Sequence, residues 1–350
     1  MKKLLLLTLF AINAIFLTGC NHLHAPDMEM IDLDRLNQDE FSHVRPDVTL
    51  IFAEVNPVDT IVGQLSLTFA NKVAYLSQGT IRINVQASGV LGSEGDVLNS
   101  MLGGGGVIDM ARISAFALTP FGGEKSSLLS VPYAFGSRDH FWNFVDSDLA
   151  QSFLMEPHYN GSGVRGLFYG EEGFRHFFTV NPITSMEDLS GMRLRVSTDP
   201  MMVGMVENLG AQATAISFGE LYSALATGVV DGAEQPIVNY RSNAFPEVAP
   251  YLILNGHTLG AVQVIVSDEA WERLTTDQQQ ILIEAGKYAS ARNREMSELM
   301  EQEVLELLRE EGVTVIDVDD IAPWREAVMP TIKSATDHMW DLFNQILELE

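Results

Sequence analysis

The chain has 350 residues, and its 47 acidic residues against 21 lysines and arginines give a net charge of −26. A surface this acidic argues against nucleic acid or an anionic bilayer as a partner. It does not exclude a small anionic ligand, because physiological salt screens distant charges beyond about 8 Å and an arginine in a dry cleft can outweigh them.

The first twenty residues are typical of a secretory signal. Lys2 and Lys3 precede an apolar run over 4–16, which is short for a membrane span and ends in Leu-Thr-Gly-Cys. This ending is similar to a bacterial lipobox, in which the cysteine is acylated and becomes the first mature residue. Cys20 is the only cysteine, so an intramolecular disulfide is excluded and an ordinary free thiol is the alternative. Losing the two lysines with residues 1–19 lowers the net charge from −26 to −28.

Residues 20–46 are expected to form a lipid-anchored tether, because acids, histidines and prolines mix there without a period. The spacing of His22, His24 and His43 fits no metal site. We therefore expect no metal here and no cofactor.

Strand and helix patterns alternate after Asp47. Apolar patterning predicts strands at 48–55, 80–86 and 107–114, with helices at 58–76 and 92–102 between them. This alternation is typical of a mostly parallel sheet with helices on its faces.

A second unit repeats the alternation. Strands are predicted at 174–180, 193–196 and 214–216, with a helix from Pro200. Ser217 and Glu220 have capping-box spacing before a further helix that Gly228 ends. Two such units in about 300 residues predict two lobes with a cleft between them.

The last third contains one long helix, capped at 276–279 and ended by Gly312. At 1.5 Å per residue it is about 50 Å long, enough to brace both lobes. Its expected buried stripe is Ile281, Ala285, Tyr288, Ala289, Met296, Leu299, Met300 and Leu307. Its glutamates, Glu298, Glu301, Glu303, Glu306, Glu310 and Glu311, are expected to form a solvated face.

Motifs for catalysis are weak or absent. The glycine run at 103–106 precedes a strand rather than a helix, and Glu124 in FGGEKSS would repel a phosphate. The sequence contains no HExxH, CxxC or GxSxG motif. A carboxylate pair for glycoside cleavage stays open as an enzyme alternative.

Several stretches resemble the solute-binding subunits of TRAP transporters, the DctP-type family. They are GFRHFFT, SMEDLSGMRLRV, LGAQATAISFGELYSALATGVVDGAEQP and FPEVAPYLILNGH within 173–257, and GVLGSEGDVLNSML, IDMARIS and VPYAF upstream. The resemblance covers about 48–316. It implies an α/β, two-lobed, type II-like periplasmic-binding-protein fold. We expect lobe I to be 47–172 plus about 261–300, and lobe II to be 173–260 plus about 301–350.

The resemblance also implies a binding role for two arginines. In MRLRVS, residues 192–197, apolar and polar residues alternate, so Arg195 lies either on a solvated strand face or in a cleft. Its position matches the family arginine that pairs with the ligand carboxylate, for which a guanidinium is a two-pronged donor. Arg175 matches a second ligand-facing arginine, or else it pairs with a cleft acid.

Five more residues are candidates through the resemblance. Phe218 matches a pocket aromatic, with core packing as the alternative, and Gln235 stands where the family usually has Asn. Glu54 and Asn56 end the first strand, where open α/β sheets bind ligands. With Arg112, which could instead form a buried ion pair, they resemble the branch that binds sugar acids.

The expected function is an extracytoplasmic, lipid-anchored receptor that is not an enzyme. It captures an organic acid and delivers it to the small and large multi-span subunits of a TRAP permease. A uronate or other sugar acid is the expected ligand, because Glu54 would repel a second carboxylate. The alternatives are a C4-dicarboxylate, a keto acid or sialic acid as ligand, or a sensory receptor as function.

Overall fold

The computed structural model describes residues 37–103 and 106–350, so the signal segment and Cys20 lie outside the described residues. The strands are β1 (Val48–Ala53), β2 (Ile81–Gln86), β3 (Met110–Ser114), β4 (Val164–Thr179), β5 (Arg193–Val196), β6 (Gln212–Ala215), β7 (Gly232–Pro236), β8 (Tyr251–Ser267) and β9 (Thr314–Asp317). The helices before β5 are α1 (Ile61–Leu76), α2 (Glu94–Leu102), α3 (Arg138–Val145), α4 (Asp148–Leu154) and α5 (Glu156–Tyr159). The later helices are α6 (Pro200–Asn208), α7 (Leu221–Ala226), α8 (Ile237–Ser242), α9 (Asp268–Glu272), α10 (Thr276–Glu310), α11 (Ala322–Ala327), α12 (Met329–Thr336) and α13 (Trp340–Leu347).

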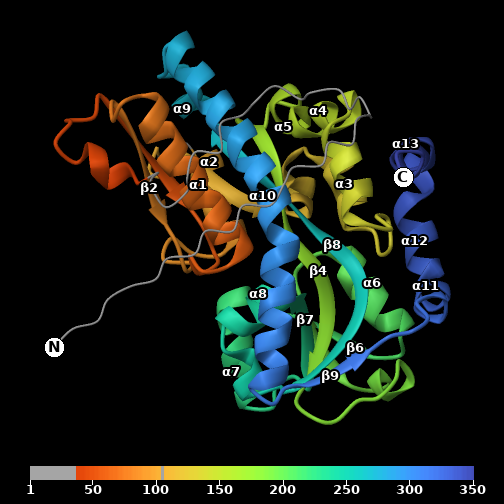
Figure 1. The fold of residues 1–350 in the computed structure, drawn as a ribbon. Coiled ribbons are helices and arrows are strands. Elements are labelled where there is room, and N and C mark those ends of the chain that lie inside the picture. Colours follow the sequence, from red (N-terminus) through yellow and green to blue (C-terminus); the bar gives the residue numbers. More distant parts are fainter. Residues whose placement is uncertain (1–36, 104–105) are drawn as a thin grey trace, which may run out of the picture. The chain divides into compact units, whose positions relative to one another are not determined.

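Nine strands of the described residues form one mixed sheet in the order β2-β1-β3-β8-β4-β7-β5-β6, with β9 beside β8. The outer groups β2-β1-β3 and β7-β5-β6 are internally parallel. The alternation with helices predicts this for the first group and for β5 and β6, whereas the third strand expected in the second unit, 174–180, belongs to β4 and runs antiparallel to β7. Strands β8 and β4 join the two groups and run antiparallel to each other and to their outer neighbours. Figure 1 shows this long β4–β8 pair running between the two groups.

The long joining strands are where the prediction was incomplete. The sequence pattern predicts only 174–180 of β4, and it predicts neither β8 nor the short strands β7 and β9. The β4–β8 pairing changes register between Gly166 and Phe168, between Glu171 and Phe174, and between Arg175 and Phe177. Each irregularity breaks the two-residue alternation on which strand prediction depends.

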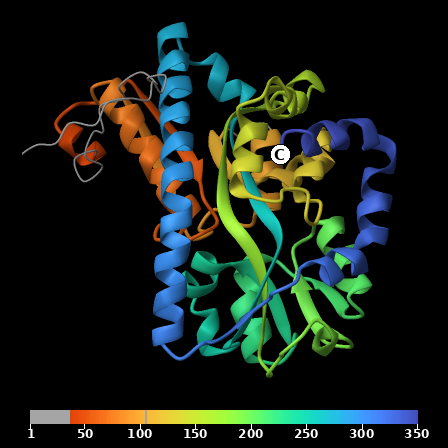
Figure 2. The ribbon, with the colours of Figure 1, turned by 45° about the vertical axis from the view of Figure 1, so that its right-hand side comes forward.

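Helix α10 spans both groups, as predicted. Its first half packs on α1 in one hydrophobic cluster through Leu282, Ala285 and Ala289, and Leu308 near its end packs in another cluster with Tyr240 of α8. Figure 2 shows α10 running along both groups of strands. The capping box belongs to Thr275 and Gln278, so the expected start was one residue late.

The buried face of α10 differs from the expected stripe. Leu299 is 66% exposed, whereas Asn293, Ser297 and Glu301 are buried. Five of the six named glutamates are exposed, but the expectation of a solvated side chain is wrong for Glu301. The reason is tertiary, because Glu301 pairs with Arg138 and accepts the amide of Phe174.

The capping box expected at Ser217 and Glu220 is also absent. The Ser217 hydroxyl donates to the Glu220 carboxylate at 2.6 Å instead of capping backbone amides. A tight turn over Phe218–Glu220 precedes α7, and it brings the two side chains together. Gly228 follows α7 with a φ of +70°, as expected of a helix-ending glycine.

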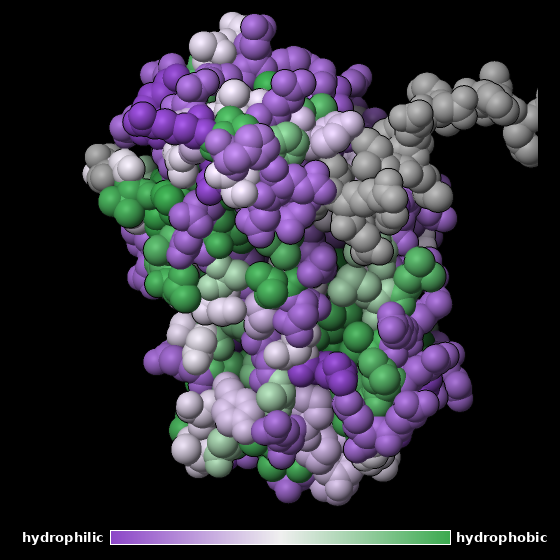
Figure 3. All heavy atoms as spheres, turned by 60° about the vertical axis from the view of Figure 1, so that its left-hand side comes forward, coloured by the Kyte–Doolittle hydropathy of each residue, from purple (hydrophilic) through white to green (hydrophobic). Residues whose placement is uncertain are grey.

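The C-terminal helices return along the molecule (Figure 2). Helix α12 packs on α6, whereas α13 contacts α3 through a hydrogen bond between His140 Nε2 and the carbonyl oxygen of Ile346 (2.8 Å). The exposed large hydrophobic residues come from many separate elements. On the face in Figure 3, hydrophobic residues lie in several groups among hydrophilic ones.

Candidate ligand-binding site

Arg195 is a buried cation in the middle of a parallel sheet. It lies on β5 between Thr214 of β6 and Ala233 of β7, and only 3% of its surface is exposed. Its Nε donates to the carbonyl oxygen of Ile216 at 2.9 Å. Within residues 37–103 and 106–350 its terminal nitrogens make no hydrogen bond, and no carboxylate forms a salt bridge with it. The side chain is therefore available to an anion.

The surroundings of Arg195 disfavour its charge. Burial lowers its pKa to about 10, and Arg175 adds to that effect, while Glu234 and Glu94 oppose it. The guanidinium stays charged at neutral pH. A bound carboxylate would replace the solvation that burial has removed.

Arg175 differs from Arg195 because it has partners. It pairs with Glu234 of β7 and with Glu172, and its Nη2 lies 3.0 Å from Glu234 Oε1. Burial raises the pKa of Glu234, but Arg175 and His257 outweigh burial and bring it to about 2. The structure thus contains the ion pair that was the alternative interpretation of Arg175.

Arg112 and Glu54 form a second buried pair. Arg112 Nε donates to Glu54 Oε2 at 2.8 Å, and Arg112 Nη1 donates to Glu94 Oε1 at 3.0 Å. Glu54 also accepts hydrogen bonds from the backbone amide of Asn56 at 2.8 Å and from the Ser66 hydroxyl at 3.1 Å. Both oxygens of Glu54 are occupied by neighbours, which leaves it poorly placed to select a ligand hydroxyl.

The remaining candidates are Gln235, which lies on β7, and Phe218, which lies in the turn before α7. Gln235 is buried on β7 opposite His176 of β4. Phe218 is half-buried, and its ring meets that of Phe245 edge-on with centroids 6.1 Å apart. The packing alternative for Phe218 therefore has a partner in the structure.

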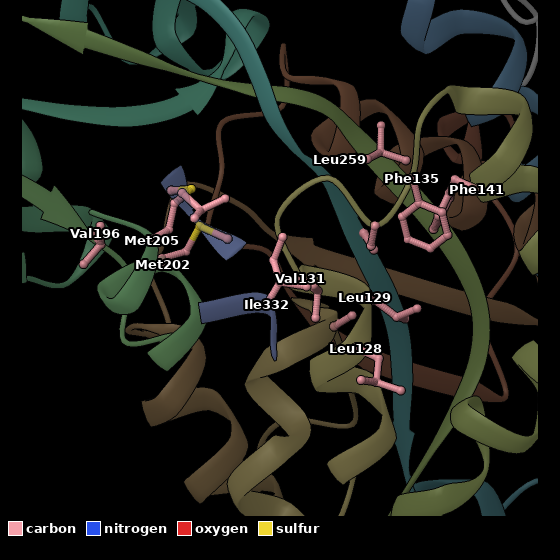
Figure 4. Close-up of a cluster of buried hydrophobic side chains, with 14 of the residues drawn as sticks. Leu128, Leu129, Val131, Phe135, Phe141, Val196, Met202, Met205, Leu259 and Ile332 are labelled. Atoms are coloured by element: carbon pink, nitrogen blue, oxygen red, sulfur yellow. The ribbon is translucent and has the colours of Figure 1, made fainter. Parts of the chain in front are cut away.

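A cavity opens beside the ion pair of Arg175 and Glu172. Glu172, Arg175, Ser197, Asp199 and Thr258 contribute polar groups to its wall. Leu129, Met202 and Leu259 form part of its apolar wall and belong to the hydrophobic cluster in Figure 4. Arg195 is not itself in the wall, but Ser197 follows it by two residues.

The described part of the chain has neither a metal-binding cluster nor a helix that could span a membrane. Residues 37–103 and 106–350 contain no group of three His, Cys, Asp or Glu side chains placed to hold a metal ion. In the same residues, every helix is too short or too polar to cross a bilayer.

The family of the chain follows from comparison with known proteins. The DctP family, described as bacterial extracellular solute-binding protein, family 7, matches residues 52–338. The chain belongs to the DctP family.

Relatives of this DctP-family protein share its fold. A TRAP periplasmic solute-binding protein from Xanthobacter autotrophicus Py2, with bound β-D-galacturonate, is 26% identical, with a TM-score of 0.80 over 86% of this chain and 100% of that chain. One from Pseudomonas putida F1, with bound D-glucuronate, is 28% identical, with a TM-score of 0.80 over 85% and 96%. The sialic acid-binding periplasmic protein of Vibrio cholerae is 27% identical over 264 residues, 75% of this chain and 81% of its own. The DctP-family chain is thus a TRAP-type solute-binding protein with a two-lobed fold.

Sequence reasoning missed four charged or polar residues of this DctP-family site: Glu94, Glu172, Asp199 and Thr258. Glu94 begins α2, directly after its capping Ser93, and Asp199 caps α6 before Pro200. Their helix-start positions were signals that could have been read. Glu172 and Thr258 lie on the long strands that were not fully predicted, so the sequence offered no comparable signal.

Proposed function

We propose that this chain is the extracytoplasmic receptor that captures a uronate or another sugar acid for a TRAP-type permease. Arg195 carries the proposal, as a buried guanidinium without a carboxylate partner in the described residues. Two solved relatives that hold galacturonate and glucuronate support the ligand class. Arg195 forms the salt bridge to the ligand carboxylate, while Arg175, Gln235, Phe218, Arg112, Glu54 and Asn56 surround or support the site.

Closure of the two lobes strengthens this salt bridge. We take lobe I as 47–172 plus about 261–300 and lobe II as 173–260 plus about 301–350. Closing the cleft removes water from the ion pair and lowers the local dielectric constant. The ligand thereby favours the closed form, which the permease recognises. The receptor changes no covalent bond, so mass spectrometry should recover the ligand unchanged after incubation.

Calorimetry on Arg195 variants tests the proposal. Removing one partner of a buried charge pair costs roughly 3–5 kcal/mol, so Arg195→Ala should weaken uronate binding by more than about a hundredfold. Arg195→Lys should also bind weakly because the two-pronged donor is lost. Arg193→Ala is the matched control, since Arg193 lies on the same strand but pairs with Asp231 and has a 43% exposed side chain.

Titration of competing organic acids tests which class of ligand the receptor binds. D-glucuronate, D-galacturonate, succinate, malate, pyruvate and sialic acid should be titrated under the same conditions. Micromolar binding of a dicarboxylate without uronate binding would contradict the sugar-acid assignment. Wild-type affinity in Arg195→Ala would contradict the role of Arg195.

Attachment to the membrane is a separate part of the proposal. The motif at 17–20 supports acylation of Cys20 after removal of residues 1–19. The mass of the mature N-terminus tests this directly. An unmodified Cys20, or a different first residue, would contradict the lipid anchor.

A further inference from the structure

Two buried oxygens in the wall of the cavity have no hydrogen-bond partner in the described residues. They are Oδ2 of Asp199 and Oγ1 of Thr258, in residues that are only 2% and 4% exposed. Asp199 Oδ1 is used, because it accepts the amide of Met201 at 3.0 Å. The nearby Ser130 hydroxyl donates to the carbonyl oxygen of Ser127 at 3.0 Å. Buried polar groups are rarely left unpaired, so a shared external partner would account for both atoms.

The rest of the wall indicates what that partner is. Leu129, Met202 and Leu259 add apolar surface to the same wall, and Ser114 and Ser197 add hydroxyls. A sugar ring has this combination, with C–H faces to pack and hydroxyls around its edge to bond.

Charge disfavours a second carboxylate in the cavity, because it would meet Asp199 and Glu172. Burial raises the pKa of Asp199 to about 6, with the Met201 amide and Ser130 opposing it, so the carboxylate is mainly ionised above pH 7. An ionised carboxylate accepts hydrogen bonds from neutral hydroxyls.

We propose that Asp199 and Thr258 form a hydroxyl-recognition subsite for the sugar part of the ligand, in the cavity whose wall includes Ser197, two residues after Arg195. One ligand hydroxyl donates to Asp199 Oδ2, and a second exchanges a hydrogen bond with Thr258 Oγ1. The subsite rests on the proposed function, since Arg195 must hold the carboxylate while the hydroxyls reach the cavity.

Calorimetry with D-galacturonate and D-glucuronate at pH 7.5 tests the subsite with Asp199→Asn and Thr258→Val. Asn keeps the helix cap, but it has an NH2 group where Asp has its second acceptor oxygen, so Asp199→Asn should lower the affinity about tenfold or more. Thr258→Val should lower the affinity about fivefold or more. Asp109→Asn and Thr336→Val are matched controls, because both residues are buried but lie outside the cavity wall. They should retain wild-type affinity.

A uronate that lacks one ring hydroxyl identifies the contact. Wild type should bind one such deoxy analogue more weakly than the parent, and Asp199→Asn should lose that discrimination. If wild type binds uronates and Arg195→Ala does not, but both subsite variants keep full affinity, the subsite is wrong and the proposed function stands. If wild type binds no sugar acid, both are wrong.

Discussion

Buried charges in this protein fall into two kinds. Arg112 and Arg175 each have two carboxylate partners, so they are satisfied before any ligand arrives. Arg195 and the Asp199 carboxylate are buried without an ion-pair partner in the described residues. A residue of the second kind lowers the stability of the free protein and gains its partner on binding.

Asp199→Asn is expected to stabilise the protein in a pH-dependent way. Burial raises the pKa of Asp199 from 3.8 to about 6, so the folded protein binds a proton between these values that the unfolded chain releases. The protonated Asp199 side chain therefore makes its full contribution to the free energy of unfolding below pH 4, and this contribution is lost as the pH rises through 6. The stability advantage of Asp199→Asn over wild type should grow by on the order of 2–3 kcal/mol across this interval.

Urea denaturation of both proteins without ligand at pH 4.0, 5.0, 6.0 and 7.5 measures the difference. Asn serves equally well as a helix cap, so capping does not change. A difference between the two proteins that stays constant from pH 4.0 to 7.5 would contradict the expected titration.

At the scale of elements, α10 binds the irregular part of β4 through polar side chains four residues apart. Asn293 accepts the Glu171 amide at 2.7 Å and donates to its carbonyl oxygen at 3.0 Å. Ser297 bonds the Glu171 carboxylate, and Glu301 accepts the Phe174 amide at 2.9 Å. These contacts satisfy backbone groups of Glu171 and Phe174, which flank the register shift in β4.

Gly173→Ala should disturb this contact between α10 and β4. Gly173 has a φ of +97°, and an added Cβ would lie 2.3 Å from Glu301 Oε1. Glu301 cannot withdraw freely, because Arg138 and the Phe174 amide hold it. Gly191→Ala is the control, with a φ of +79° and no atom within 4 Å of the added Cβ.

Both substitutions strain the backbone, so their difference measures the clash. We expect Gly173→Ala to lose about 1–3 kcal/mol more stability than Gly191→Ala in urea denaturation. Equal losses would mean that Glu301 does not pack tightly against the bulge.

The sequence predicted what depends on local patterns and residue chemistry. The long helix and most of the parallel strands follow from periodicity. The cleft position expected for Arg195 came from the family resemblance, because its strand pattern left a solvated face open. The buried face of α10 was wrong at Glu301, because a polar residue at helical spacing is normally solvated. Asp199 and Thr258 were missed because an unpaired oxygen is a property of the assembled wall, which local sequence does not specify.

For the whole molecule, the C-terminal segment links distant parts of the chain. Helices α11 and α12 contact β8 and α6, and α13 packs with α3. Phe343 and Ile346 of α13 are buried in the same hydrophobic cluster as Met205 of α6 and Phe141 of α3. This segment thereby connects elements that flank the cavity.

Deletion of residues 340–350 should destabilise the protein by about 3–6 kcal/mol, since two large hydrophobic side chains lose their burial. Deletion of 348–350 is the control. It removes the hydrogen bond from Asn143 to the Leu349 carbonyl oxygen (2.9 Å) and the half-buried Leu349 side chain, but it leaves Phe343 and Ile346 in place. Thermal unfolding of both truncated proteins gives the comparison, and similar losses would show that α13 contributes little.

The order of strands in the sheet also constrains how the protein can be made. Strand β8 lies between β3 and β4, yet residues 251–267 leave the ribosome long after either neighbour. A nascent chain of 250 residues holds both outer groups of strands but has open edges on β3 and β4. Such edges pair readily with other chains. Until β8 has paired with β3 and β4, a partly folded chain is thus exposed to pairing with other chains.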